Sequence, residues 1–183
     1  MTPALAILEL SSIARGVIAS DALVKRAPVT LLQSRPVSSG KHLLVFGGPV
    51  AEVEEALAAG KAIAADALVD ELYLSFADSQ LAPLLAGDPP RISIRDSVAV
   101  FETTTVCAAV RAADAAAKAA EVTLMELRLA AGIGGKAYFT MTGELHAIEA
   151  SAAAGRDAIA ANRIINVEVI PAPHDDIKKK LLF

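Results

Sequence analysis

The sequence predicts an α+β protein built from two similar domains in tandem, and three observations lead to this prediction. First, residues 97–128 repeat the sequence of residues 4–35. Second, both repeats alternate short apolar runs with Ala-rich segments of helical periodicity, in the same order. Third, 183 residues suffice for two small cores of about 90 residues each. This unit is longer than the roughly 20–50 residues of solenoid repeats, so we expect two complete domains.

Residues 93 positions apart correspond in the two repeats up to about residue 35, and residues 95 apart correspond beyond it; corresponding residues are called counterparts below. Many counterparts are identical. They include Glu9/Glu102, Val17/Val110, Asp21/Asp114, Lys25/Lys118 and Arg35/Arg128. After a two-residue insertion the match resumes, with Gly40-Lys41 corresponding to Gly135-Lys136.

Apolar spacing and capping residues predict the elements of the first repeat. The apolar run 4–10 is typical of a strand, and Ile13, Val17 and Leu23 then follow on one helix face, with Ser11 or Ser12 as N-cap. Pro49 suits the first turn of a helix. We expect strands at 4–10, 29–35, 41–48 and 67–74, and helices at 11–27, 49–66 and 80–85.

The second repeat predicts the same order of elements. We expect strands at 97–103, 122–128, 136–142 and 163–170, and helices at 105–120, 144–161 and 174–182. The Pro- and Gly-rich segment 87–96 is typical of a linker, which places the domains at 1–86 and 97–183. Each domain then has the βαββαβ order of the ferredoxin-like fold, followed by a terminal helix.

Composition narrows the class of function. The net charge is −4, tryptophan is absent and basic residues are scattered, so nucleic-acid binding is not expected. Apolar residues make up 54 % of the chain, but no apolar run reaches the roughly 20 residues that span a bilayer. The excess apolar surface favours subunit interfaces. A single cysteine, Cys107, favours a reducing cytoplasm and is interpreted as a small core residue.

Two loops attract attention because they occupy equivalent places in the repeats. The segment AAGIGGK (130–136) lacks the first glycine and the Ser or Thr of a phosphate-binding P-loop, and a strand follows it. Its counterpart PVSSGK (36–41) is also small and polar. We interpret both as tight backbone loops that can converge around an axis.

Candidate catalytic or metal-ligating groups do not cluster in the sequence. His42, His146 and His174 show no metal-ligand spacing, and surface or capping roles are expected for them. Asp21/Lys25 and Asp114/Lys118 recur at i, i+4. These pairs are either plain intrahelical ion pairs or, as we favour, positions where the lysines contact neighbouring molecules. An enzyme is therefore not expected.

Read together, these segments resemble the tandem-domain shell proteins of bacterial microcompartments. The resemblance rests on ILELSSIARG and VFETTTVCAA at the repeat starts and on the two D-A-x-x-K helices. It also rests on SRPVSSGKHLLVFGGPVAEVEEALAAG, AGIGGKAYFTMTGELHAIEASAAAG and IPAPH, so it covers essentially the whole chain. The chain is most similar to the non-permuted, single-layer type found in propanediol-utilisation compartments.

The resemblance implies a homotrimer whose six domains form a pseudohexameric tile with a central pore for small polar metabolites. Such tiles assemble with hexameric and pentameric shell proteins around enclosed enzymes. The implied pore-lining residues are Val37, Ser38, Ser39, Gly40, Gly132, Ile133, Gly134 and Gly135. The implied tile-edge residues are Asp21, Lys25, Asp114, Lys118 and His174.

One residue departs from part of this family. Some relatives carry a cysteine in the first pore loop and hold an iron–sulfur cluster, whereas this chain has Ser38 there. A hydroxyl is a poor ligand for iron–sulfur centres, so we expect no cofactor. The alternative function is a tandem ferredoxin-like regulatory module that binds a small ligand at domain interfaces.

Overall fold

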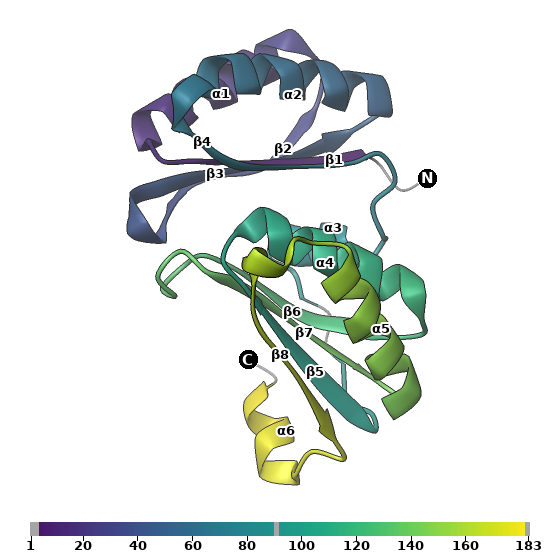
Figure 1. Ribbon diagram of the computed structural model, residues 1–183. Coiled ribbons are helices and arrows are strands. Elements are labelled where there is room, and N and C mark those ends of the chain that lie inside the picture. Colours follow the sequence, from purple (N-terminus) through teal and green to yellow (C-terminus); the bar gives the residue numbers. More distant parts are fainter. Residues whose placement is uncertain (1–3, 90–91, 182–183) are drawn as a thin grey trace. The chain divides into compact units, whose positions relative to one another are not determined.

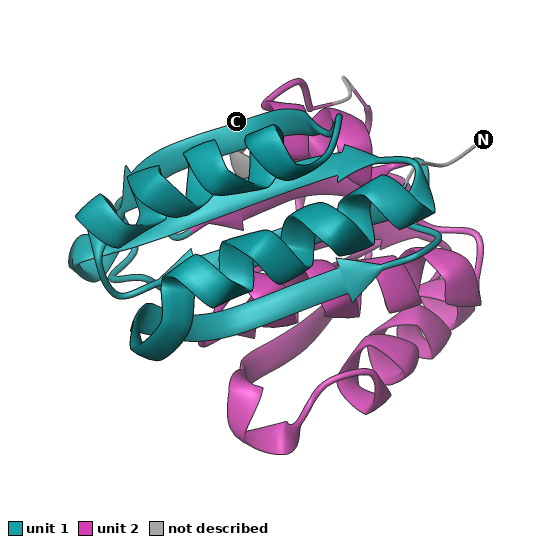
Figure 2. Ribbon diagram, turned by 90° about the horizontal axis from the view of Figure 1, so that it is seen from above, with its two compact units in different colours: residues 1–79, 130–135 teal, residues 80–129, 136–183 magenta. Residues whose placement is uncertain are grey.

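A computed structural model describes residues 4–89 and 92–181 of the chain (Figure 1). Residue contacts divide the chain into two units, coloured in Figure 2. Unit 1 comprises Met1–Ser79 and Ala130–Gly135, and unit 2 comprises Gln80–Leu129 and Lys136–Phe183. Positions 90 and 91 of the expected linker and Leu182 of the expected last helix lie outside the described residues.

Unit 1 has the predicted order of elements. In chain order these are β1 (Ala4–Leu10), α1 (Ile13–Arg26), β2 (Thr30–Val37), β3 (Lys41–Gly48), α2 (Val50–Ala64) and β4 (Leu68–Leu74). The strands form an antiparallel sheet in the order β2-β3-β1-β4, and α1 and α2 lie on one face of it (Figure 1). This arrangement confirms the ferredoxin-like prediction for the first repeat.

The core of unit 1 follows from strand alternation. Ala6, Leu8 and Leu10 point from β1 to the helix face, where they join Phe46 of β3 and Leu23 of α1 in one buried cluster. Helix α1 begins where Ser12 accepts a hydrogen bond from the Arg15 amide at 3.3 Å, as the N-cap prediction requires.

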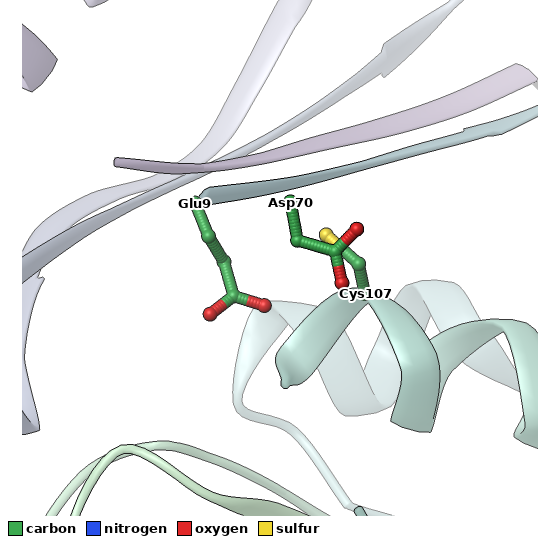
Figure 3. A group of neighbouring side chains, drawn as sticks. All are labelled: Glu9, Asp70 and Cys107. Carbon is green, nitrogen blue, oxygen red and sulfur yellow. The ribbon is translucent and has the colours of Figure 1, made fainter. Parts of the chain in front are cut away.

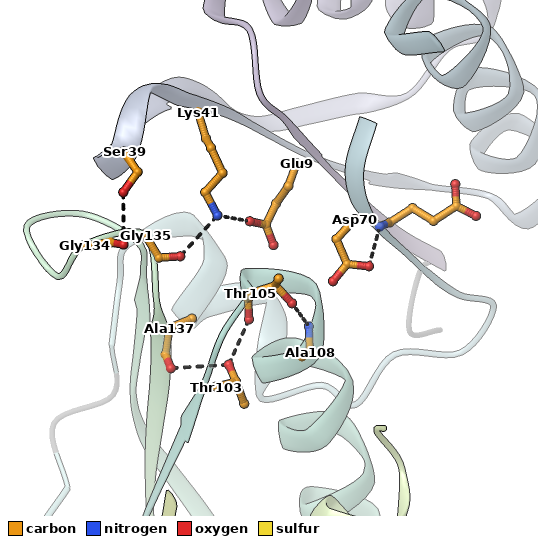
Figure 4. Close-up of polar contacts among 11 residues, drawn as sticks. Glu9, Ser39, Lys41, Asp70, Thr103, Thr105, Ala108, Gly134, Gly135 and Ala137 are labelled. Carbon is orange, nitrogen blue, oxygen red and sulfur yellow. Dashed lines mark hydrogen bonds and ion pairs between the residues drawn. The ribbon is translucent and has the colours of Figure 1, made fainter. Parts of the chain in front are cut away.

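Unit 2 repeats this arrangement. Its elements are β5 (Ser97–Thr103), α4 (Val106–Ala119), β6 (Thr123–Leu129), β7 (Ala137–Gly143), α5 (Leu145–Asp157), β8 (Ile164–Pro171) and α6 (Asp175–Leu181). The sheet order is β6-β7-β5-β8. Phe101 and Phe139 stack across β5 and β7 with ring centroids 5.0 Å apart. Thr105 caps α4 by accepting from the Ala108 amide at 3.2 Å (Figure 4).

The short helix α3 (Leu81–Ala86) follows β4 but belongs to unit 2, whereas the sequence places it at the end of the first domain. It packs against α4 and β6. Just before it, the Gln80 side chain bonds the edge of β6, donating to the Val122 carbonyl at 3.2 Å and accepting from the Leu124 amide at 2.8 Å. These long-range contacts explain why local sequence did not reveal the assignment.

Two helices end earlier than their periodicity predicts. Helix α2 stops at Ala64, because Ala65 adopts a φ of 46°, and a 3₁₀ turn follows at Ala65–Ala67. Helix α5 stops at Asp157 rather than 161, and Ala161–Arg163 forms a separate 3₁₀ turn. Within the described residues, none of the helices combines the length and the apolarity needed to span a membrane.

Candidate functional site

The two candidate pore loops are tight backbone turns, as the sequence predicts. The first follows β2 as a 3₁₀ turn at Ser38–Gly40, in which Ser39 and Gly40 have positive φ angles of 65° and 70°. The second joins β6 to β7, and Ala130, Gly132, Gly134 and Gly135 all have positive φ. Glycine adopts such angles without the strain that a Cβ causes, which accounts for its density in the second loop.

The two loops are hydrogen-bonded to each other within unit 1. The Ser38 amide donates to the Ala130 carbonyl at 3.2 Å, and the Ser38 Oγ accepts from the Gly132 amide at 2.8 Å. The Ser39 Oγ donates to the Gly134 carbonyl at 3.0 Å (Figure 4). We call Ser38–Lys41 and Ala130–Gly135 the loop pair. The sequence predicted equivalent loops but not their direct pairing.

A lysine at the start of β3 anchors the loop pair. The Lys41 Nζ donates to Glu9 Oε2 at 2.8 Å and to the Gly135 carbonyl at 3.2 Å (Figure 4). Glu9 is fully buried at the end of β1, where it is the cross-strand partner of Asp70 on β4 (Figure 3). A buried carboxylate is costly unless it is paired, so Lys41 stabilises β1 and the second loop together.

The second repeat has the same ion pair in a more open setting. Lys136 Nζ lies 3.0 Å from Glu102 Oε1. The Lys136 side chain is 51 % exposed, compared with 14 % for Lys41. The sequence shows both residues as identical counterparts, but it gave no sign that they pair with each other.

His42, next to Lys41, is buried, which corrects the expectation of a surface or capping role. Its ring packs against Gly16 of α1, where an added Cβ would lie 2.6 Å from the His42 Cβ. A large side chain at the start of β3 is therefore accommodated by a glycine on the helix above it. Sequence reasoning missed this pairing because the two residues are distant in the chain.

A chain of hydrogen bonds connects His42 to α1. The His42 Nε2 bonds the Ser34 Oγ at 3.0 Å, and Ser34 bonds Ser20 at 2.8 Å. Ser20 in turn donates to the Gly16 carbonyl at 2.9 Å. The His42 Nδ1 has no partner among the described residues, and burial lowers the pKa of His42 below its usual value. We call Ser20, Ser34 and His42 the histidine cluster.

The candidate edge residues form the local contacts that their spacing predicts. Lys25 pairs with Asp21 and Lys118 with Asp114, both at 2.6 Å. The intrahelical ion pairs are therefore present, and an edge role would be additional to them. His174 is exposed and begins α6, because its carbonyl accepts from the Ile177 and Lys178 amides.

Two further residues match their interpretations. His146 is exposed in the first turn of α5, 3.5 Å from Glu144. Cys107 is buried in the first turn of α4, which confirms a core position (Figure 3).

Comparison with known proteins identifies the family to which this architecture belongs. The BMC domain matches the chain twice, at residues 4–76 and 97–173. The bacterial microcompartment shell protein PduT of Citrobacter freundii is 38 % identical, over 100 % of this chain and 99 % of its own length.

Solved structures of microcompartment proteins have the same architecture. A microcompartment protein from Desulfitobacterium hafniense superposes with a TM-score of 0.90 at 36 % identity, covering 98 % of this chain and 99 % of that one. A fused permuted hexameric shell protein from the RMM microcompartment shares the fold, with a TM-score of 0.64 at 23 % identity over 85 % and 83 % of the two chains. These relatives support a structural shell role and give no support to the ligand-binding regulatory alternative. The chain belongs to the BMC-domain family and is a tandem-domain shell protein of a bacterial microcompartment.

Proposed function

We propose that the chain assembles as a homotrimer, a pseudohexameric tile of the microcompartment shell, with the loop pairs around a central pore. In this role it is structural rather than catalytic. The observation that carries the proposal is that unit 1 exposes an apolar helix surface on α1, whereas in unit 2 the equivalent helix α4 has a short helix packed on it.

The helix surface is exposed in unit 1 and buried in unit 2. On α1, Val17 is 56 % exposed and Ile13 is also exposed, although both are large apolar residues. Their counterparts on α4, Val110 and Val106, are fully buried. Identical or similar residues on the same helix face are thus exposed in unit 1 and buried in unit 2. A soluble chain rarely leaves such a face open unless a partner covers it.

A short helix packs on α4 in unit 2, and α1 in unit 1 has no such helix among the described residues. Helix α3, which follows the last strand of the first repeat, packs on α4 and β6 in unit 2. Helix α6 follows the last strand of the second repeat and is the equivalent of α3. We infer that α6 of a second copy covers α1 and β2. Such head-to-tail contacts close into a ring, and three two-repeat chains supply six domains.

Solution mass tests this assembly. The wild-type chain should have three times the mass of one chain, and Val17→Arg should yield single chains because the charge cannot be buried at the interface. Val50 is an exposed valine at the start of α2, so Val50→Arg is a matched control that should remain trimeric. A wild-type chain that stays monomeric or dimeric at all concentrations would overturn the proposal.

The pore that we propose is uncharged and holds no metal cluster. Val37, Ser38, Ser39, Gly40, Gly132, Ile133, Gly134 and Gly135 carry no ionisable side chain. The Ser38 hydroxyl accepts a bond from the Gly132 amide, and hydroxyls are poor ligands for iron–sulfur centres. After reconstitution with iron and sulfide, the wild-type chain should bind no cluster, and visible charge-transfer absorption would contradict this.

We also propose that Lys25, Lys118 and His174 lie at tile edges that meet hexameric and pentameric shell proteins. Lys25 and His174 are well exposed, which such contacts require. Lys25→Asp should block co-assembly with partner hexamers and leave the trimer intact. Normal co-assembly of this variant would remove Lys25 from the edge.

A further inference from the structure

A set of three residues at the base of the loops is identical in both repeats. It consists of a glutamate at the end of the first strand, a glycine that ends the loop, and the lysine that follows this glycine. The two sets are Glu9, Gly40 and Lys41 in the first repeat, and Glu102, Gly135 and Lys136 in the second. The glycines have similar left-handed φ angles of 70° and 82°.

One lysine of the two has both an acidic and a carbonyl partner. Lys41 Nζ bonds Glu9 Oε2 at 2.8 Å and the carbonyl of Gly135, which is the loop glycine of the other repeat, at 3.2 Å. Gly135 is tightly enclosed there. An added Cβ would lie 3.2 Å from the Ser39 Oγ and 3.3 Å from the Lys41 Cε.

The other lysine lacks the carbonyl partner. In the described part of the chain Lys136 Nζ pairs with Glu102 at 3.0 Å, and no loop carbonyl joins this pair. Gly40, the counterpart of Gly135, is correspondingly open, because an added Cβ would meet no atom within 4 Å. Among the described residues, Lys136 therefore lacks the carbonyl partner that Lys41 has, and Gly40 lacks the enclosure that Gly135 has.

We propose that Lys136 of one copy donates a hydrogen bond to the Gly40 carbonyl of a second copy, and so completes the site between chains. The inference rests on the proposed trimer and adds to it the residues that join the loops at each chain–chain junction. The same Glu–Lys–carbonyl contact would then occur six times around the pore. Three of these contacts would lie within chains and three would lie between chains.

The matched lysines allow a sharp test. A lost charge-assisted hydrogen bond weakens a contact by about tenfold or more, so Lys136→Met should raise the concentration at which the trimer dissociates by at least about tenfold. The double variant Glu9→Gln/Lys41→Met removes the same lysine from a contact within one chain without leaving a buried carboxylate unpaired. It should leave that concentration within about twofold, and faster amide hydrogen exchange in 130–135 should report its local effect. Equal dissociation of wild type and Lys136→Met would overturn the inference.

A cross-link provides a direct second measurement, made at a protein concentration well above that at which the Lys136→Met trimer dissociates. In the double variant Gly40→Cys/Lys136→Cys, a short bismaleimide should join chains into species that survive denaturing electrophoresis. Each single variant is a control, and Cys107 is buried. Trimers without cross-links would overturn this inference and leave the proposed tile standing. A wild-type chain that never trimerises would overturn both.

Discussion

The two repeats use different chemistry at the place where helix, edge strand and loop meet. The first repeat has a glycine, two serines and a histidine there, and the second has only apolar residues. The counterpart pairs are Gly16/Ala109, Ser20/Ala113, Ser34/Leu127 and His42/Ala137. The strand register confirms the last pair, since His42 lies opposite Leu10 and Ala137 opposite Thr103, the counterpart of Leu10.

The same sheet order thus accommodates a polar set of side chains in one repeat and an apolar set in the other. A histidine packed against a glycine in the first repeat stands where the second repeat has two alanines, and the order of the strands is unchanged. The first repeat thereby acquires a polar, ionisable group beside the loop pair. The sequence of either repeat alone would not show that these positions change together.

The largest effect is expected from Gly16→Ala. The new Cβ would lie 2.6 Å from the His42 Cβ, a contact that rotation of the ring does not relieve. Overpacking should lower the free energy of unfolding by about 1–3 kcal/mol, measured by urea denaturation. This outweighs the gain of about 1 kcal/mol in helix propensity.

The double variant Gly16→Ala/His42→Ala introduces the alanine pair of the second repeat. It should recover most of the stability lost in Gly16→Ala. If the two substitutions simply added their costs, the close contact between positions 16 and 42 would not be the cause of the loss.

The next effect concerns pH. Burial lowers the pKa of His42 in the folded chain below its ordinary value of 6.5. The unfolded chain therefore takes up a proton more readily than the folded chain. The contribution of His42 to stability is complete above about pH 6.5 and is lost as the pH falls through the lowered pKa.

Thermal unfolding between pH 7.5 and about pH 5 measures this contribution. The loss of stability on acidification should be smaller in His42→Ala than in wild type. His146→Ala, which alters an exposed histidine of unit 2, should retain the wild-type slope. Equal slopes in all three proteins would contradict the role of His42.

A smaller effect is expected from Ser20→Ala, which introduces the residue found at the counterpart Ala113. The variant removes the bond from Ser20 to Ser34 while leaving the Ser34–His42 bond in place. The free energy of unfolding should fall by about 0.5–1.5 kcal/mol. A neutral Ser20→Ala would show that the histidine cluster does not contribute to stability.

The smallest effect compares the two i, i+4 ion pairs. Asp21 is 60 % exposed, and Asp21→Ala should cost only about 0.2–0.5 kcal/mol. Asp114 is 9 % exposed, and Asp114→Ala should cost about 1 kcal/mol because a buried, hydrogen-bonded group is lost. Chemical denaturation of both variants would show whether burial separates these identical pairs.

Local sequence was sufficient to place most of the elements. The predicted strands 4–10, 41–48 and 97–103 have the observed bounds, because an apolar run bounded by serine, glycine or proline leaves little choice of strand ends. The tight loops were predicted from glycine and serine content, and their positive φ angles confirm that interpretation.

Contacts between distant residues escaped prediction. The sequence did not show that His42 lies beneath Gly16, that α3 packs on α4, or that Lys41 reaches the Gly135 carbonyl. In each case the two partners are far apart in the chain, and each has an ordinary local context. Nothing in composition or periodicity distinguishes a lysine that bonds a distant carbonyl from one that faces water.

The duplicated α+β fold follows from local sequence, since a repeated pattern of apolar spacing specifies the same elements twice. Local sequence also determined the kind of loop, because glycine content sets backbone freedom. Identical residues of the two repeats differ in environment, and this difference becomes visible in the folded chain. Val17 is open and Val110 is buried, and Lys41 is enclosed while Lys136 is exposed. Burial depends on what packs against a residue, and a repeat shares its sequence but not its neighbours.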